Sequence, residues 1–274
     1  MDIQNGVKLL LEADKIEAIN FPTETHREFI VFISQQCKKS AITALLKGSM
    51  AKGNAQEYSD IDIILTGENI SNCLDLIIGS FDKILLSEHF AATSTYMVVY
   101  ANGLAVEYDV RKTVTEEDIK KSLALNISDY QISGIPRDRL FVNSCFCPKR
   151  SREYSLLMIA QMCCAKLLCQ KAALARDIYY DRVKLLGNDM TLLGNLDKAT
   201  IHEEPKRQFL NRIRQLIFAY DAGSPEISEY LRDLFYKAAE IENSMIGRLA
   251  AATEANISDV VLHVLKNSIC VDLH

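Results

Sequence analysis

The segment from Lys47 to Leu65 constrains this chain more than any other. It reads KGSMAKGNAQEYSDIDIIL, so a Gly-Ser pair follows one apolar run and two aspartates enter another. Acidic and apolar residues alternate from Asp60 through Asp62 to Ile63, which is the period of a β-strand and puts both carboxylates on one face. Two adjacent carboxylates repel each other, and a divalent cation removes that conflict. Mg²⁺ in particular is bound by a few carboxylates together with substrate phosphates.

The Gly-Ser pair suits the phosphate side of such a site. Gly48 allows the backbone to approach a ligand closely, and Ser49 offers a hydroxyl beside backbone N–H groups. The segment as a whole therefore predicts a metal-dependent phosphate site.

The first half of the chain alternates helical and strand patterns. An Asn-Gly turn at Asn102 and Gly103 lies between two apolar runs, which predicts a β-hairpin. Thr115 begins the pattern of a capped helix. From apolar spacing we expect helices over 4–18, 23–39 and 69–81, and strands over 41–47, 61–65, 83–87, 95–100 and 104–110.

Everything after Arg152 has the pattern of helices, over 156–174, 208–219, 227–250 and 257–269. Glycine and proline gather between 126 and 150, so we expect the domain boundary there, with domains 1–148 and 149–274. The predicted fold class is α+β, with a mixed sheet flanked by helices in the first domain and an all-α helical bundle in the second.

The Gly-Ser pair, ten residues and then Asp-x-Asp on a strand resemble the nucleotidyltransferase superfamily that includes DNA polymerase β. Within that superfamily, the segment looks most like the aminoglycoside and lincosamide nucleotidyltransferases and the minimal nucleotidyltransferases. The resemblance covers under a tenth of the chain. It implies ATP or another nucleoside triphosphate as co-substrate and two Mg²⁺ ions held by Asp60 and Asp62.

The resemblance also implies a third carboxylate on a neighbouring strand. Glu107 is the preferred residue, and Asp109, on the same face of the predicted hairpin arm, is the alternative third ligand. Glu107 would hold a second metal ion or accept the proton of the attacking hydroxyl, and the sequence leaves both roles open. Gly48 and Ser49 would contact the β- and γ-phosphates, and Lys52 would either assist them or be a solvated loop lysine.

Lys166 is the one charge between Glu153 and Lys171, in an otherwise apolar helix. Burying an ammonium group without a partner is costly. Antibiotic nucleotidyltransferases have a lysine on a comparable helix, which implies that Lys166 reaches the triphosphate; a lysine snorkelling to the surface is the alternative. Some relatives carry a catalytic glutamate one turn earlier, where this chain has Met162, and Glu107 gains weight as the base.

The histidines, the acidic run at 116–118 and the cysteines are better explained by structural roles than by catalysis. The histidines, among them His26, His89 and His202, lack the spacing of metal ligands. The acidic run at 116–118 fits the first turn of a helix, where carboxylates favour the dipole, better than a site for a cationic substrate. The eight cysteines are expected to be free thiols in a reducing cytoplasm.

The composition limits which kinds of partner the protein is expected to bind. The net charge is −5 and no long basic run is present, which makes bulk nucleic acid an unexpected partner. No apolar run approaches the roughly 18 residues of a membrane span. The first residues lack the features of a secretory signal, so we expect a cytoplasmic protein that does not bind membranes.

The leading hypothesis is therefore a nucleotidyltransferase that moves AMP from ATP to a hydroxyl of a small molecule, an aminoglycoside or lincosamide by family resemblance. One alternative is a protein-adenylylating enzyme of the antitoxin type. Another is a non-catalytic nucleotide-binding regulator. Relatives often pair, so a homodimer belongs to the first hypothesis.

Overall fold

A computed structural model describes residues 19–90, 95–128, 130–135, 138–148, 150–186, 197–219 and 224–252. The helices predicted over 4–18 and 257–269 lie outside the described residues. The chain divides into two compact units, Met1–Met158 and Ile159–His274, and each is described separately.

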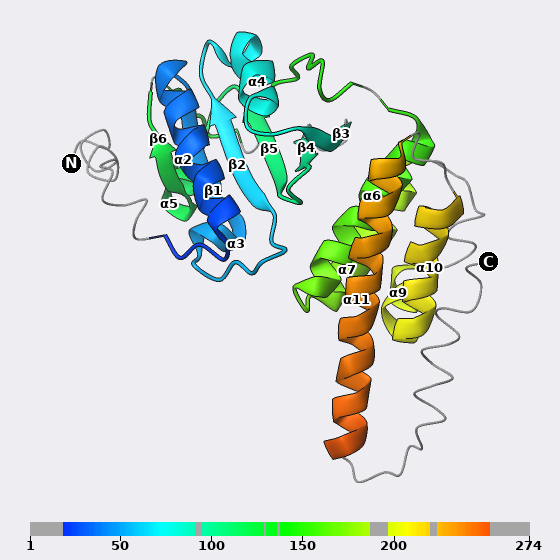
Figure 1. Ribbon diagram of the computed structural model, residues 1–274. Helices are drawn as coiled ribbons and strands as arrows, with labels where there is room; N and C mark the ends of the chain where they lie inside the picture. The colour runs from blue at the N-terminus through cyan, green and yellow to red at the C-terminus, as the bar shows by residue number, and fades with distance from the viewer. Residues whose placement is uncertain are drawn as a thin grey trace. The chain divides into compact units, whose positions relative to one another are not determined.

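The first unit is built on one mixed sheet of six strands in the order β3-β4-β5-β2-β1-β6 (Figure 1). Neighbouring strands are antiparallel except β2 and β5, which are parallel. The strands are β1 Thr43–Lys47, β2 Ile61–Thr66, β3 Ile84–Phe90, β4 Thr95–Tyr100, β5 Ala105–Arg111 and β6 Leu123–Asn126. The α+β class with a mixed sheet is as predicted.

Among the described residues, the helices that lie wholly within this unit are α2 Glu24–Lys39, α3 Gly48–Ala51, α4 Ile70–Gly79 and α5 Glu116–Lys121. The side chain of Thr23 caps α2 by accepting the N–H of His26. At α5, Thr115 and Asp118 form a complete capping box, which confirms the helix start predicted there.

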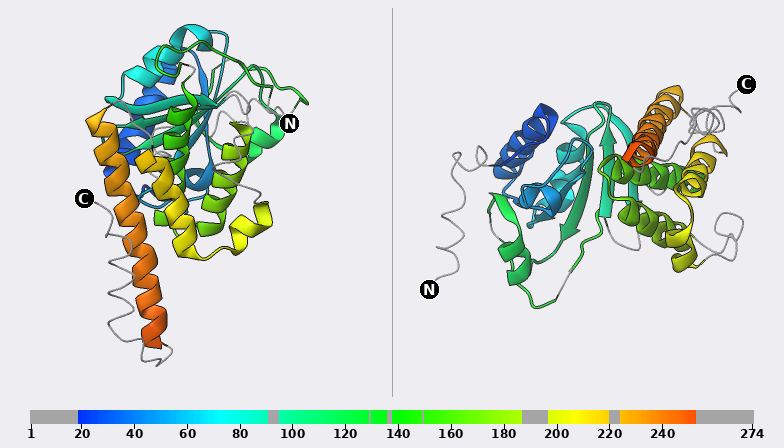
Figure 2. Two further views of the ribbon diagram at one scale, coloured as in Figure 1. Left: turned by 90° about the vertical axis from the view of Figure 1, so that its right-hand side faces the viewer. Right: turned by 90° about the horizontal axis from the view of Figure 1, so that it is seen from below.

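One face of the sheet carries the core of the unit. Alternate residues of β2, β5 and β4 are buried there against α2 and α4 (Figures 1 and 2). An aromatic cluster joins helix and sheet, with Phe29 edge-on to Phe81 at 5.0 Å between ring centroids. The hydroxyls of Tyr100 and Tyr108 lie 2.8 Å apart in a hydrogen bond. This face is apolar, so the ionisable residues of the same strands lie on the other face.

The hairpin of β4 and β5 confirms the Asn-Gly prediction. Gly103 has φ +86°, a left-handed conformation that glycine adopts without strain. The side chain of Asn102 accepts the N–H of Leu104 at 3.1 Å. The turn fixes the register in which Val99 pairs with Ala105. That register decides which residues of β5 lie beside which residues of β4 on each face of the sheet.

In the described part of the second unit every regular element is a helix. α6 Arg152–Leu168 begins in the first unit, and the helices that follow are α7 Ala172–Leu185, α9 Lys198–Glu203, α10 Lys206–Ala219 and α11 Pro225–Ala252. A single helix over 156–174 is wrong: Gln170 has φ +57°, and the N–H of Lys171 donates to the carbonyl of Lys166 at 2.8 Å. This pattern ends a helix as in a Schellman motif, although no glycine is present.

The division between the compact units falls inside α6, at Met158, and the domain boundary expected near 148 stays a prediction. The first turn of α6 is bound to strand β3 within the first unit: the hydroxyl of Tyr154 accepts the N–H of Ser87 at 3.0 Å, and the hydroxyl of Ser155 donates to the carboxylate of Glu88. These contacts anchor the start of the helix, so the chain passes from one unit to the next at Met158 without a break in α6. None of the described helices is long and apolar enough to cross a membrane.

Tyr96 provides a test of how the loop after β6 is fixed to the sheet. Its buried hydroxyl donates to the carbonyl of Val142 at 2.6 Å and accepts the N–H of the same residue at 2.7 Å. Tyr96→Phe leaves both backbone groups without this partner, so we expect a loss of about 1–3 kcal/mol in the free energy of unfolding. Urea denaturation measures it. Tyr130→Phe, at a half-buried tyrosine, is the control, and equal losses in both variants would contradict the role of the Tyr96 hydroxyl.

Candidate functional site

A row of side chains crosses the face of the sheet opposite the main core. Lys47 pairs with Asp62, Asp62 with Glu107, Glu107 with Met97, and Met97 with Glu88. Directly paired residues in a sheet point to the same face, and neighbouring strands lie roughly 4.7–4.9 Å apart. The parallel pairing of β2 and β5 thus puts Asp62 beside Glu107, as the resemblance implied for the third carboxylate.

Gly48 lies against this row. It has φ +70°, and a Cβ atom at its position would lie 1.9 Å from Oδ2 of Asp62. The carboxylate therefore occupies the space that any other side chain would need. The glycine of the Gly-Ser pair and the second aspartate of Asp-x-Asp, separated in the sequence, are in direct contact.

The other residues predicted for the phosphate side are close by in the chain. Ser49 lies in α3, directly after Gly48, and is half-buried. Lys52 follows α3 and is exposed to solvent. Asp60 immediately precedes β2, with its carboxylate partly accessible. The loop and strand thus bring Gly48, Ser49, Asp60 and Asp62 to one end of β1 and β2, which are antiparallel.

Asp109 is on the same face as Glu107 but in a different environment. It is 2% exposed, and its Oδ2 atom lies 2.5 Å from a guanidinium nitrogen of Arg111 and 3.1 Å from Nζ of Lys47. Arg111 in turn lies 2.8 Å from the carboxylate of Asp118. Glu107, by contrast, is half-buried and directly beside Asp62. This arrangement favours Glu107 over Asp109 as the third carboxylate.

The ion pairs of Arg111 with Asp109 and Asp118 shift the pKa values of these groups. Burial alone would raise the pKa of Asp109, but the hydrogen bond and charge of Arg111, with Lys47, outweigh it and hold that pKa below its ordinary value. Burial also opposes the shift at Asp118, whose pKa is lowered by the hydrogen bonds of Thr115 and by Arg111. Asp109 and Asp118 are therefore carboxylates over the whole neutral range, and Arg111 stays protonated between them.

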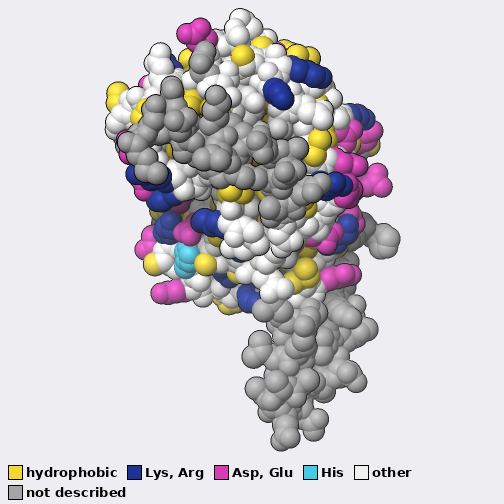
Figure 3. Space-filling model, turned by 90° about the vertical axis from the view of Figure 1, so that its left-hand side faces the viewer, with side chains coloured by type: hydrophobic (Ala, Val, Ile, Leu, Met, Phe, Trp, Pro, Cys, Tyr) yellow, Lys and Arg dark blue, Asp and Glu magenta, His cyan; other side chains and the backbone are white. Residues whose placement is uncertain are grey.

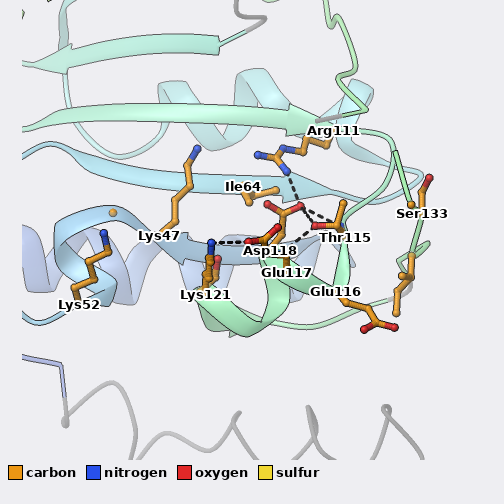
Figure 4. Close-up of a pocket in the computed structure, with 14 residues that line it drawn as sticks. Lys47, Lys52, Ile64, Arg111, Thr115, Glu116, Glu117, Asp118, Lys121 and Ser133 are labelled. Carbon is orange, nitrogen blue, oxygen red and sulfur yellow. Dashed lines mark hydrogen bonds and ion pairs between the residues drawn. The ribbon is translucent and has the colours of Figure 1, made fainter. Parts of the chain in front are cut away.

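A cavity of about 730 Å³ opens on this side of the sheet, between the end of β1 and helix α5 (Figure 4). Its lining includes Lys47, Gly48 and Lys52 at one end and Arg111 with α5 at the other. Sequence reasoning missed Lys47 and Arg111. Arg111 is two residues after Asp109 on the same strand, but the approach of Lys47 to Asp109 depends on a strand order and register that the sequence does not state.

The acidic residues of α5 line the cavity, but they have partners of their own. Glu116 and Glu117 lie 3.3 Å and 2.5 Å from the ammonium groups of Lys120 and Lys121, one turn later. Asp118 completes the capping box and binds Arg111. The structural interpretation of this acidic run therefore holds. At the Gly48 end, Lys47 and Lys52 line the cavity and supply cations for an anionic ligand.

The fit of a divalent cation depends on Asp60, Asp62 and Glu107. Among the described residues, no three His, Cys, Asp or Glu side chains form a group that would hold a metal ion on their own. A complete protein cage is not what Mg²⁺ needs, however, since it is usually bound by one or two carboxylates together with substrate phosphates and water. The paired, partly accessible Asp62 and Glu107 supply such carboxylates, and the cationic end of the cavity lies beside them.

The candidate residues of α6 lie in the second unit. Lys166 is 8% exposed, and Met162 is buried one turn before it, so the helix does bury an ammonium group. Lys166 is not among the residues that line the cavity. Its predicted contact with the triphosphate stays a prediction.

The histidines and cysteines that the sequence analysis set aside are explained by contacts within the protein. The ring of His89 packs 4.5 Å from that of Tyr96, and His202 lies 3.0 Å from the carboxylate of Asp177. The described cysteines are free, as expected. His26 is different, because it is buried and bound to the loop that precedes Asp60.

Charged side chains of both signs are interspersed on the side of the molecule shown in Figure 3, outside the residues drawn in grey. No broad basic surface is visible on the described part of that side. This distribution agrees with the net charge of −5.

No protein-family model matches the sequence, and no curated protein matches it. Among solved structures, a STING-associated CdnE c-di-GMP synthase from Capnocytophaga granulosa is similar over 82% of each chain, with 10% identity and a TM-score of 0.26. A CCA-adding enzyme in complex with CTP has 12% identity and a TM-score of 0.32, over 96% of this chain and 65% of that one. The Thermotoga maritima CCA-adding enzyme complexed with tRNA-CCA has 12% identity and a TM-score of 0.32, over 85% of this chain and 62% of that one.

The chain thus spans less than two thirds of both CCA-adding enzyme chains. TM-scores this low assign it neither a family nor an activity. None of the three structures is described as an antibiotic nucleotidyltransferase, so closeness to that group stays a prediction.

Gly48 and Gly53 form a matched pair for testing the contact with Asp62. Both have positive φ, +70° and +69°, but a Cβ atom at Gly53 would meet nothing within 4 Å. Both alanine variants strain the backbone, by about 1–2 kcal/mol. Gly48→Ala also collides with the carboxylate, so we expect it to lower the free energy of unfolding by roughly 1–3 kcal/mol more than Gly53→Ala. Equal losses in urea denaturation would contradict the close contact.

The buried carboxylates predict a loss of stability in acid. The pKa values of Asp109 and Asp118 are lowered on folding from an ordinary value of 3.8, so their contribution is complete above that pH and is lost as the pH falls through the folded pKa values. Denaturation midpoints measured from pH 6 to pH 2 should therefore fall most steeply below about pH 4. Asp109→Asn is less stable throughout but has one fewer group to titrate, so its acid slope should be shallower. An identical slope in both proteins would show that Asp109 does not carry the effect.

Proposed function

We propose that this chain is a nucleotidyltransferase that moves a nucleoside monophosphate, AMP from ATP, to a hydroxyl group of a small molecule. The observation that supports it most is the pairing of Asp62 with Glu107 across parallel strands, with Gly48 packed against Asp62. The family resemblance of the sequence motif implied these residues. Their contact in the folded sheet, beside the cavity that Gly48 lines, is a separate, geometric reason for the same assignment.

The nucleotide is proposed to lie with its triphosphate at the Gly48 end of the cavity. The Ser49 hydroxyl and the backbone N–H groups near Gly48 would donate hydrogen bonds to the phosphate oxygens. Lys52 is exposed at the same place and balances part of the charge. Lys47, held by Asp109, adds a second ammonium group to this end of the cavity. In this proposal Lys166 contributes a further cation from α6.

Asp60 and Asp62 would hold the ion that binds the triphosphate, and together with Glu107 they would hold a second ion. Bound Mg²⁺ neutralises phosphate oxygens and lowers the pKa of an attacking hydroxyl. Asp60 and Asp62 would hold their ion where it can position the α-phosphate for in-line attack. Glu107 either shares the second ion or accepts the hydroxyl proton itself, which requires hydrogen-bond reach.

In the proposed transfer, the acceptor oxygen forms a bond to the α-phosphorus. The bond from that phosphorus to the oxygen bridging to the β-phosphate breaks, and pyrophosphate leaves with the electron pair. The acceptor proton passes to Glu107 or to water. Aminoglycosides and lincosamides are proposed as acceptors because of the family resemblance, and fold-level analogy does not by itself fix a substrate.

The test is an adduct assay with the full chain. The protein is incubated with Mg²⁺, each labelled nucleoside triphosphate and separate acceptors: aminoglycosides, lincosamides, cell-extract protein and total RNA. We expect pyrophosphate release and a small-molecule adduct with the mass of one nucleoside monophosphate. Asp60→Asn and Glu107→Gln should each reduce transfer by roughly 100-fold or more, since a metal contribution of several kcal/mol is lost. Glu24→Gln, on the exposed side of α2, is the matched control.

The other outcomes separate the alternatives. A labelled protein band would support the protein-adenylylating enzyme, and tight nucleotide binding without turnover would support the regulator. Labelled RNA would contradict the expectation drawn from net charge. Full activity in Asp60→Asn would refute the assignment of the metal site.

A further inference from the structure

His26 is buried at the start of α2 and makes a contact far along the chain. Its side chain is 2% exposed. Nε2 lies 3.0 Å from the carbonyl oxygen of Ser59, and Nδ1 lies 2.7 Å from the hydroxyl oxygen of Thr23. Ser59 is the residue directly before Asp60, so one ring connects the N-terminus of α2 with the segment that enters β2.

The partners of the ring fix its tautomer. A carbonyl oxygen can only accept, so Nε2 carries the proton and donates it to Ser59, and Nδ1 accepts from the hydroxyl of Thr23. The oxygen of that hydroxyl also accepts the N–H of His26, which orients it. Burial lowers the pKa of His26, in keeping with a neutral ring. The imidazole is thus held in a single orientation with its N–H aimed at Ser59.

The segment that His26 contacts is a tight turn with its own hydrogen bonds. The N–H of Ser59 donates to the carbonyl of Gln56 at 2.9 Å, and the hydroxyl of Ser59 accepts the N–H of Gln56 at 2.9 Å. These bonds close the turn on itself. The bond from His26 connects the turn to α2, at the carbonyl of the peptide unit that continues into Asp60.

We propose that His26 is a positioning residue for Asp60: its hydrogen bond to Ser59 fixes the backbone from which the Asp60 carboxylate projects. Asp62 and Glu107 lie within paired strands, whereas Asp60 precedes β2 and directly follows this turn. The inference rests on the proposed function for its metal, but the placement of the turn is independent of it. Groups that orient ligating residues typically change metal affinity by roughly 10–100-fold when removed.

Two amide variants separate the contacts of the two ring nitrogens. In His26→Gln the side-chain amide reaches about as far as Nε2 and can still donate to Ser59. In His26→Asn the amide is near the place of Nδ1, so it keeps a contact with Thr23 and loses Ser59. Ser34→Ala is the control, because it removes another hydrogen bond from α2 to a backbone carbonyl, that of Leu125 at 2.8 Å, away from Asp60.

Three measurements are made on each full-length variant: Mn²⁺ affinity by electron paramagnetic resonance, kcat and KM for nucleotide transfer, and hydrogen exchange of the peptide spanning 56–61. We expect His26→Asn to weaken Mn²⁺ binding by about tenfold and to lower kcat more than it raises KM for the nucleotide. It should also speed exchange in that peptide. His26→Gln should restore all three toward wild type, and Ser34→Ala should leave them unchanged.

Mn²⁺ affinity and peptide exchange in His26→Asn equal to those of wild type would overturn the inference. Equal losses in His26→Gln and His26→Asn would also overturn it, because they would show a general packing role. If the wild-type chain neither binds Mn²⁺ nor transfers a nucleotide, the proposed function fails. The exchange of the 56–61 peptide then still decides whether His26 fixes the segment before Asp60.

Discussion

The parallel pairing of β2 with β5 is the constraint on which the candidate site depends. These strands are far apart in sequence and are neighbours in the sheet, where Asp62 lies opposite Glu107. A shift of one residue in this pairing would exchange the faces of β5, moving Glu107 toward α2 and α4 and Tyr108 toward the cavity. The apolar core prevents that shift, because Tyr108 and the other β5 residues on its face are buried under the helices. The packing of one face thereby sets the chemistry of the other.

On the sheet face opposite the main core, the buried charged side chains are stabilised by ion pairs and not by contact with water. Arg111 is 3% exposed and lies between the carboxylates of Asp109 and Asp118. A buried carboxylate would otherwise have a raised pKa or require water, and a buried guanidinium group would lose its hydration without compensation. Asp118 has a second role as the capping residue of α5, so the same contact that stabilises Arg111 fixes this wall of the cavity. Fold and site therefore share these side chains.

Local signals in the sequence predicted the parts of the fold that are locally determined. The Asn-Gly turn at Asn102 gave the hairpin, Thr115 gave the start of α5, and alternation at Asp60 to Ile63 gave the strand β2. The break after α6 escaped prediction because Gln170 adopts a left-handed conformation without being glycine. The contacts of Tyr154 and Ser155 with β3 also escaped prediction, because they join residues that are distant in the sequence.

For the candidate site, the sequence predicted which residue types to examine but not how they are held. Glu107 and Asp109 are two residues apart on one face of β5, and spacing alone left both as candidates. The difference between them comes from other strands: Lys47 of β1 and the neighbouring Arg111 bind Asp109, while Asp62 of β2 lies beside Glu107. His26 is a similar case, because its partner Ser59 is distant in sequence and the bond depends on how α2 packs. A carboxylate that is paired with cations of the protein, as Asp109 is, is suited to holding those cations in place. A carboxylate that is partly accessible and lies beside another carboxylate, as Glu107 is, is suited to binding an ion from solution.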